Sequence, residues 1–540
     1  MQLSLCTPNR SKALHLECDC ETSPVKLPVS SWRGPVTVHC NIPYAGIAGF
    51  WQPQMNRPRQ QLLWDYQFNS SFQCGLPFFS MFSTENINRF SIGFSNAVST
   101  MEFRIRMNQE LGCAELTVDF VAQEDFVIFI DTVPSRTWME VLRDYCCFLH
   151  PSPLVPAPDA AWNPVFCTWY AAHAELDTRW TEENAALAAK LGFGTFIIDD
   201  GWCFDEKKRV SPSTVSTWYE HIGDWEVSMV KFPDFHSHVK RVKEMGLTYM
   251  VWVAPFLVGC RSRLADRVAT AGNDPCGFAR LDPNDSAGMR LVLNQVLKLA
   301  EKYELDGLKV DFIDTLPPCE VPDAGKYIYN FVRELAEKLR AHNPEALIEF
   351  RQNYSTIMTA GYATQFRAND TPFDFMENFN RIVQLRLLLG DGVPIHSDPV
   401  FWNRNAEEEE IARHLVAALA GVPMASLDLT TLTGTEEAIF RNYLAFYRTH
   451  RDFYQFGKWK IFAEQDCYAG IVAEYHGRRL AIAAQRAFAF DYATTHPAEL
   501  VLLNLTGTSL HLPNLKRVWN GKGEEIPSAS GIPVGGRGEF

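Results

Sequence analysis

The sequence contains no apolar segment long enough to cross a membrane. Its longest apolar run, residues 415–427, is interrupted by Gly421 and Pro423, whereas a membrane-spanning helix needs about 20 mostly apolar residues. The first 20 residues lack the basic start and the long apolar stretch of a secretory signal. We therefore expect a protein without membrane contact, located in the cytoplasm.

Basic residues are also too few for a polyanionic partner. Lys and Arg number 50 against 64 Asp and Glu, which gives a formal net charge of −14. Nucleic-acid binding depends on basic surfaces that release condensed counterions, and no long block of Lys or Arg is present. The 14 cysteines form no paired Cys-x-x-Cys motif, so the sequence has no recognisable zinc pattern.

The 540 residues divide into three regions by their hydrophobic pattern. Residues 1–150 contain short alternating strands separated by turns and predict an N-terminal β-sandwich. A segment with five prolines, residues 151–164, follows it and marks a domain boundary. Residues 446–540 return to short strands and predict a small C-terminal antiparallel β domain.

Residues 160–445 alternate short apolar segments with amphipathic segments of helical length, which is typical of a parallel sheet covered by helices. Eight such units predict a central (β/α)8 TIM barrel, within a multidomain α/β protein. An open doubly wound sheet is the structural alternative. The eight predicted strands are residues 165–170, 195–200, 248–255, 307–312, 346–352, 364–370, 393–398 and 422–428.

Polar and aromatic residues are concentrated where these strands end. In a barrel of this kind the catalytic groups lie at the C-terminal ends of the strands. We therefore expect a pocket lined by carboxylates and aromatic rings. The candidate residues at six strand ends are Trp169, Tyr170, Asp199, Asp200, Trp202, Lys309, Asp311, Glu349, Arg351, Arg367, Asp370, His396 and Asp398.

Paired carboxylates beside aromatic rings suit glycoside hydrolysis. One carboxylate attacks or stabilises the oxocarbenium-like centre, and the other protonates the leaving oxygen. An aromatic face stacks on a sugar ring, and Asp side chains accept hydrogen bonds from its hydroxyl groups. Each residue taken alone also fits a structural role, since Asp200 precedes a glycine and Lys309 with Asp311 could form a buried ion pair.

Four motifs, in their order along the chain, resemble the α-galactosidases of glycoside hydrolase family 36 and, more distantly, family 27 of the same clan. They are Asp-Asp-Gly-Trp at 199–202, Gly-Asp-Trp at 223–225, Lys-Val-Asp at 309–311 and Arg-Ala-Asn-Asp at 367–370. The resemblance covers roughly residues 160–440. It implies a retaining exo-α-glycosidase that forms a covalent glycosyl-enzyme intermediate with a terminal α-galactoside, an α-linked oligosaccharide or glycoconjugate.

The resemblance also implies roles for individual residues. Asp311 matches the catalytic nucleophile and Asp370 the acid/base, whose pKa we expect to be raised. The residues that match or resemble substrate-binding positions are Asp199, Asp200, Lys309, Trp225, Trp169, Tyr170 and Arg367; Trp202 lies in the first motif, and Arg351 is a further candidate. We expect neither a metal ion nor a cofactor.

Two features depart from the family pattern. Residues 349–354 stand where many members have a Cys- and Gly-rich segment that contacts the sugar around C2, so the C2 substituent is left open. The chain is also short for the family, with a reduced N-terminal domain, which leaves a homo-oligomer open. An α-N-acetylgalactosaminide is therefore one alternative substrate, and an anionic galactoside bound by Arg351 and Arg367 is another.

Other reactions fit the same residues. A transglycosidase would use the same covalent intermediate with a sugar acceptor. A magnesium enzyme could use Asp199, Asp200, Asp311 and Asp398, but no Gly-rich phosphate loop accompanies them. A non-catalytic sugar-binding barrel would lack one of the paired carboxylates, and both are present.

Overall fold

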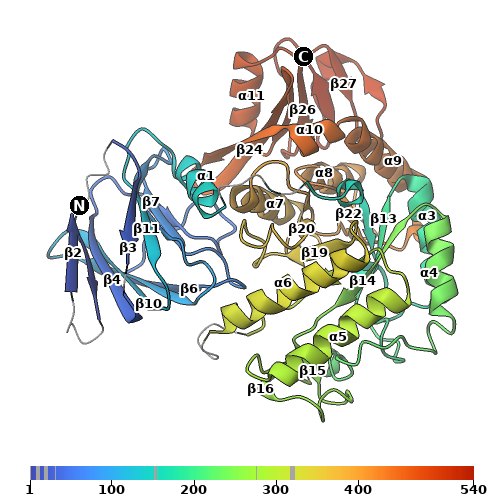
Figure 1. The fold of residues 1–540 in the computed structure, drawn as a ribbon. Coiled ribbons are helices and arrows are strands. Elements are labelled where there is room, and N and C mark those ends of the chain that lie inside the picture. The colour runs from blue at the N-terminus through green and yellow to red at the C-terminus, as the bar shows by residue number, and fades with distance from the viewer. Residues whose placement is uncertain are drawn as a thin grey trace.

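The computed structural model describes residues 2–7, 13–17, 22–30, 32–150, 154, 156–274, 277–316 and 323–540. An N-terminal β region, a central barrel and a C-terminal β region pack side by side (Figure 1). This arrangement confirms the predicted fold class, a (β/α)8 barrel between two β regions. Among the described residues, no helix has both the length and the apolar character needed to cross a membrane.

Two antiparallel sheets form the N-terminal region. The first has the order β2-β1-β4-β10-β9-β6 and the second the order β3-β11-β8-β7-β5. Apolar residues alternate with partly exposed ones along β9, whereas β7 is buried throughout. The strands are β1 (Gln2–Cys6), β2 (Ala13–Glu17), β3 (Val25–Val29), β4 (Gly34–Pro43), β5 (Gly49–Trp51), β6 (Asp65–Ser70), β7 (Phe78–Phe82), β8 (Asn88–Phe94), β9 (Met101–Asn108), β10 (Cys113–Ala122) and β11 (Phe126–Asp131).

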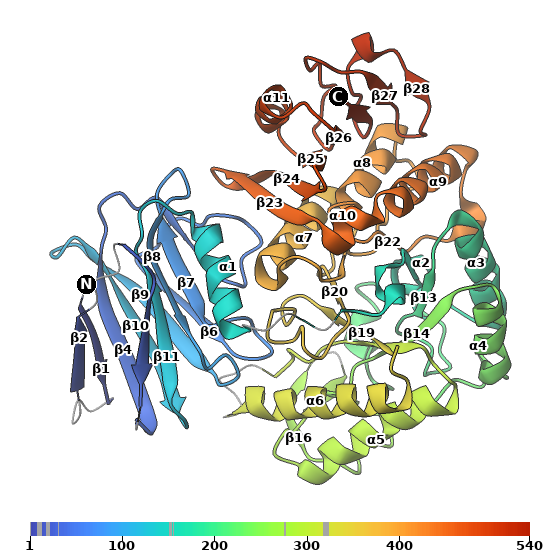
Figure 2. The same ribbon diagram turned by 45° about the horizontal axis from the view of Figure 1, so that its top comes forward.

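Helix α1 (Trp138–Leu149) connects the sandwich to the barrel. Thr137 and Glu140 form a capping box at its start, which satisfies two otherwise free backbone N–H groups. The helix packs on β7 and β8 and also on α7 (Phe375–Leu389) of the barrel, as Figure 2 shows. Its buried Trp138 stacks on Trp51, with ring centroids 4.9 Å apart.

Eight parallel strands form the barrel, and each begins within one or two residues of a predicted segment. Their order is β21-β20-β19-β18-β14-β13-β12-β22. The isolated parallel bridge between His396 and Val422 closes the ring. The strands are β12 (Val165–Cys167), β13 (Thr195–Ile198), β14 (Thr248–Val253), β18 (Gly307–Val310), β19 (Leu347–Arg351), β20 (Gln365–Arg367), β21 (Ile395–His396) and β22 (Met424–Ala425).

Helices surround this ring, and a small sheet is inserted after β14. The helices are α2 (Trp169–Ala172), α3 (Thr178–Leu191), α4 (Phe235–Glu244), α5 (Ser286–Lys302), α6 (Ala324–His342), α7, α8 (Glu408–Ala418) and α9 (Gly434–Thr449). The inserted sheet contains β15 (Leu257–Gly259), β16 (Thr270–Asp274) and β17 (Phe278–Leu281). Helix α7 is buried on nearly every side, so its sequence lacks a clear amphipathic period.

The C-terminal region differs from its prediction in two respects. It is not purely antiparallel, because β25 pairs with β26 in parallel, and α11 (Arg486–Thr495) packs on β24 and β25. The boundary expected at residue 446 falls inside α9, which is followed by α10 (Arg451–Phe456). The strands are β23 (Lys458–Glu464), β24 (Cys467–Tyr475), β25 (Arg478–Ala483), β26 (Leu500–Asn504), β27 (Arg517–Trp519), β28 (Glu525–Ile526) and β29 (Arg537–Glu539).

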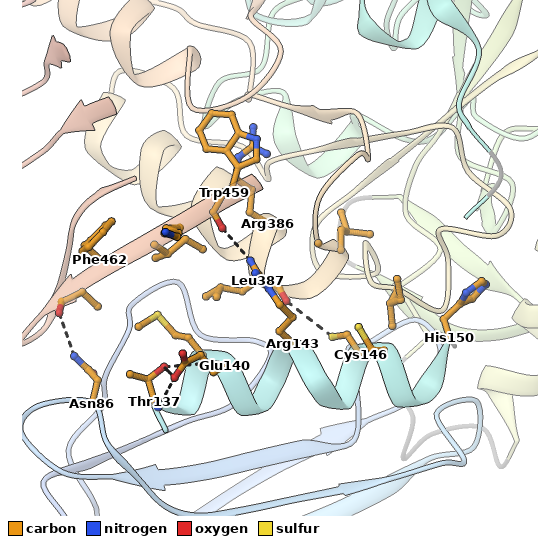
Figure 3. A pocket seen from close by; sticks show the side chains of 18 of the residues that line it. Asn86, Thr137, Glu140, Arg143, Cys146, His150, Arg386, Leu387, Trp459 and Phe462 are labelled. Atoms are coloured by element: carbon orange, nitrogen blue, oxygen red, sulfur yellow. Dashed lines mark hydrogen bonds between the residues drawn. The ribbon is translucent and has the colours of Figure 1, made fainter. Parts of the chain in front are cut away.

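A hollow lies where the three regions meet, between α1, the end of α7 and β23 (Figure 3). It contains about 1400 Å³ of open space and is lined mainly by apolar groups, with Arg143 and Glu140 among its charged residues. Arg143 donates a hydrogen bond to the carbonyl of Trp459 across the junction. None of the candidate site residues lines this hollow.

Candidate active site

A second, smaller cavity lies at the C-terminal end of the barrel strands and contains about 290 Å³ of open space. Seven of the eleven residues predicted to form the site line it. Three residues that the sequence did not single out line it as well. The ten lining residues are Trp169, Asp199, Asp200, Tyr219, Trp252, Lys309, Asp311, Phe312, Arg367 and Asp370.

Asp311 follows β18 directly and is nearly buried. Its Oδ2 accepts a hydrogen bond from the indole N–H of Trp252 at 3.0 Å, and its Oδ1 accepts one from the backbone N–H of Phe312 at 2.8 Å. Burial raises the pKa of this carboxyl, but the cations of Arg351, Lys309 and Arg367 outweigh burial and hold the pKa well below its usual range. Asp311 is therefore ionised and fixed in orientation.

Arg351, a further candidate for substrate binding, is not among the residues that line the cavity. Its Nε donates to Asp311, and its two terminal nitrogens donate to Asp314 at 3.2 Å and to Asn369 at 3.0 Å. The guanidinium also lies over the ring of Phe312, 4.9 Å from its centroid. Arg351 therefore ties the loop after β18 to the residue next to Asp370.

A buried ion pair joins two strands of the barrel on the other side of the cavity. The ammonium of Lys309 donates to Asp199 Oδ2 at 2.5 Å, and both side chains are almost fully buried. Burial and Arg367 act to lower the pKa of Lys309, but Asp199 raises it overall. Asp200 accepts a hydrogen bond from the indole of Trp218 at 2.7 Å, and burial raises its pKa to about 7.

Asp370 lies at the cavity rim, with its side chain 52% exposed. Arg367 donates to Asp370 at 2.8 Å and to the buried Asp398 at 2.6 Å. Burial and the charge of Asp311 would raise the pKa of Asp370, but Arg367 lowers it. The expectation of a raised pKa is therefore wrong for the unliganded protein, because Arg367 pairs with this carboxylate.

The remaining polar residues at the strand ends are buried and do not line the cavity. Glu349 is fully buried, accepts from Gln365 at 2.8 Å and lies 3.8 Å from Arg367; burial raises its pKa. Asp398 accepts from Arg367 and Tyr170. His396 contacts the carbonyl of Ala161 at 2.7 Å, away from the cavity, and burial lowers its pKa to about 4.

Three aromatic candidates also lie outside the cavity lining. Trp202 is buried and donates to the carbonyl of Trp252. Trp225 packs against the Trp252 indole, with ring centroids 6.0 Å apart, so it supports the cavity wall rather than forming it. Tyr170 donates to Asp398 and lines a neighbouring cleft instead.

The residues missed by the sequence analysis are all aromatic. Trp252 belongs to the predicted third strand, but its apolar neighbours gave no sign that the indole reaches the site. Phe312 adopts a left-handed backbone with φ of 56° directly after Asp311. Tyr219 comes from the long loop after β13 and packs edge-to-face with Phe312, at 5.5 Å between centroids. Within the described part of the chain, no group of three or more His, Cys, Asp or Glu residues is placed to hold a metal ion.

Parts of the chain are similar in sequence to known proteins. Residues 159–270 match the family model described as Melibiase. The chain is 26% identical over 301 residues to "Alpha-galactosidase 1" of Pediococcus pentosaceus, which covers 50% of this chain and 38% of that protein. It is 24% identical over 317 residues to "Alpha-galactosidase AgaA" of Geobacillus stearothermophilus, covering 54% and 41%. The matched segment thus spans about two fifths of each relative.

A solved structure extends the likeness in fold. A variant of the family 36 α-galactosidase AgaA from Geobacillus stearothermophilus, in complex with stachyose, superposes with a TM-score of 0.62 at 17% identity. The match covers 82% of this chain and 68% of that one. At this identity the comparison establishes the shared fold of the barrel and its flanking β regions.

The contacts of Arg351 predict a positioning role. Arg351→Lys keeps the charge but loses the planar fork that reaches Asp311, Asp314 and Asn369 together. We expect kcat on the substrate of this site to fall about 10- to 100-fold, with KM changed less than threefold. The matched control is Arg441→Lys, whose guanidinium pairs with Glu437 on the surface of α9. A rise in KM at unchanged kcat would instead indicate that Arg351 binds the sugar.

Proposed function

We propose that this chain, which is related in sequence and in fold to glycoside hydrolase family 36, hydrolyses terminal α-galactosides with retention of configuration. The observation that carries the proposal is the placement of Asp311 and Asp370 around one cavity. A retaining glycosidase needs two carboxyl groups, one as nucleophile and one as acid/base. The Asp199–Lys309 pair completes the cavity with groups that bind hydroxyls.

Asp311 is proposed as the nucleophile. Its carboxylate is ionised at neutral pH, because three cations surround it, and the Trp252 indole and the Phe312 N–H hold its orientation. A fixed, ionised oxygen can attack the anomeric carbon from the face opposite the leaving group. The product of this step is a glycosyl ester of Asp311, which water then hydrolyses.

Asp370 is proposed as the acid/base. Its half-exposed position at the rim lets a leaving group reach it, and later lets water reach it. It must hold a proton in the first step, whereas Arg367 favours the ionised form in the empty site. A bound sugar excludes water from the rim, which disfavours the charged carboxylate and promotes proton uptake.

Asp199, Asp200 and Lys309 are proposed to bind the terminal galactose. A Lys ammonium has three N–H donors, and within the described residues the Lys309 ammonium donates one hydrogen bond, to Asp199. Asp200 can accept from a hydroxyl or, with a pKa of about 7, donate to one. The Trp169 ring lines the same cavity and offers a face for the sugar ring.

The paired arginines weaken the case for an anionic galactoside. Arg367 contacts Asp370 and Asp398, and Arg351 contacts Asp311 and Asp314. Neither guanidinium is free for a carboxylate on the substrate, so binding an anionic galactoside would require that an existing ion pair be broken.

A second alternative is transfer of the galactosyl group to a sugar acceptor in place of water. This reaction uses the same covalent intermediate, and product analysis with sucrose present distinguishes it from hydrolysis.

The proposed substrate can be tested with a panel of nitrophenyl α-glycosides of galactose, N-acetylgalactosamine, glucose, xylose and galacturonic acid. We expect the highest kcat/KM for galactose. Asp311→Asn removes the charged nucleophile and should lower kcat by a factor on the order of 10⁴ or more. The matched control is Asp266→Asn, at an exposed site in the loop after β15. A preference for any other sugar would overturn the substrate assignment.

The Arg367–Asp370 pair predicts a difference between two pH profiles. Activity requires protonated Asp370, so the rate falls as pH rises through its pKa. The profile of kcat/KM reports the free enzyme, in which Arg367 lowers that pKa, while the profile of kcat reports the complex. We expect the alkaline limb of kcat at higher pH than that of kcat/KM. Asp370→Asn should remove both limbs; coincident limbs in the wild type would contradict this account.

A further inference from the structure

A cleft with about 1130 Å³ of open space lies beside the active-site cavity, also at the C-terminal end of the barrel. Residues after β12, β13, β21 and β22 and at the start of α9 form it. Tyr170 and Phe401 supply apolar surface, while Arg404 and Asp428 belong to its charged lining. The roles proposed above do not use this cleft.

Tyr170 links the cleft to the proposed acid/base. Its hydroxyl donates to Asp398 Oδ2 at 2.9 Å. The other oxygen of Asp398 accepts from Arg367 at 2.6 Å, and the same nitrogen of Arg367 donates to Asp370 at 2.8 Å. One wall of the cleft is therefore joined to the carboxyl that would protonate the leaving oxygen.

An exposed aromatic ring, that of Phe373, lies beside Phe401 of the cleft. Phe373 follows Asp370 by three residues, is 55% exposed and has a φ of 67°. Its ring centroid lies 5.0 Å from that of Phe401, which lies 5.6 Å from Tyr170. A bulky residue with positive φ is strained, and such strain is concentrated at functional sites. An exposed phenylalanine in this conformation indicates a function outside the core.

We propose that Phe401, together with Phe373 and Tyr170, binds the leaving group, a second hexose ring of an α-galactosyl oligosaccharide. This inference rests on the proposed hydrolase function. A hexose has an apolar C–H face, which suits an aromatic wall, and hydroxyl edges, which suit the exposed guanidinium of Arg404. The acid lies beside the leaving oxygen during cleavage, so a leaving group that passes Asp370 reaches these rings.

The proposal predicts that substitutions in the cleft affect only substrates whose leaving group carries a second sugar ring. Phe401→Ala and Phe373→Ala should each lower kcat/KM for an α-1,6-linked galactosyl-glucose disaccharide, on the order of fivefold to tenfold and mainly through KM. α-Galactosyl fluoride has no ring beyond the anomeric carbon, so its kcat/KM should change less than twofold. The control is Phe456→Ala, which removes a 61% exposed ring of α10 whose centroid lies 5.9 Å from that of Tyr475 on β24.

A binding measurement separates this proposal from the proposed function. In an Asp370→Asn background, which blocks turnover, calorimetric titration should show that Phe401→Ala weakens the disaccharide about fivefold to tenfold while methyl α-galactoside binds as before. If the wild type cleaves neither substrate but this difference persists, the hydrolase proposal fails and the sugar site stands. Equal losses for both ligands, or no loss for the disaccharide, would overturn the site itself.

Discussion

Buried charge is the constraint on which the barrel end depends. Lys309, Arg351 and Arg367 are taken out of water there, and an unpaired ion in such a place costs several kcal/mol. Each of them is paired with carboxylates. Asp199 pairs with Lys309. Asp311 and Asp314 pair with Arg351, and Asp370 and Asp398 pair with Arg367. The network lowers the pKa of Asp311 and of Asp370 and joins the strand ends to one another, so the same contacts that offset burial also orient the two carboxylates.

The two proposed catalytic carboxylates differ in their surroundings. Asp311 is almost buried and receives hydrogen bonds from three elements. Asp370 has half of its side chain in solvent and one strong partner, Arg367. A proton can reach Asp370 with little rearrangement, whereas protonating Asp311 would break several contacts. This difference supports the proposal that Asp370 acts as acid/base and Asp311 as nucleophile.

The sequence predicted the barrel well because its strands are short, apolar and separated by helices of regular length. It located Asp199, Lys309, Asp311 and Asp370 because the ends of parallel strands meet at one edge. It did not predict that Arg351 contacts Asp311, Asp314 and Asn369, since the direction of a side chain at a strand end depends on the loops that surround it. It missed Trp252 for a different reason. Within an apolar strand, the sequence pattern is the same for a tryptophan that only fills the core and for one whose indole donates a hydrogen bond to a carboxylate, as Trp252 does to Asp311.

The central claim is that Asp311 attacks the sugar and that the reaction proceeds through its glycosyl ester. Asp311→Gly removes the nucleophile and leaves room for a small anion. Incubated with azide and a nitrophenyl α-galactoside, this variant should yield β-galactosyl azide, since azide attacks from the face that Asp311 occupies and inverts the anomeric carbon once. NMR of the product shows which anomer of galactosyl azide has formed. Formation of α-galactosyl azide, or hydrolysis that persists without azide at the wild-type rate, would contradict the account.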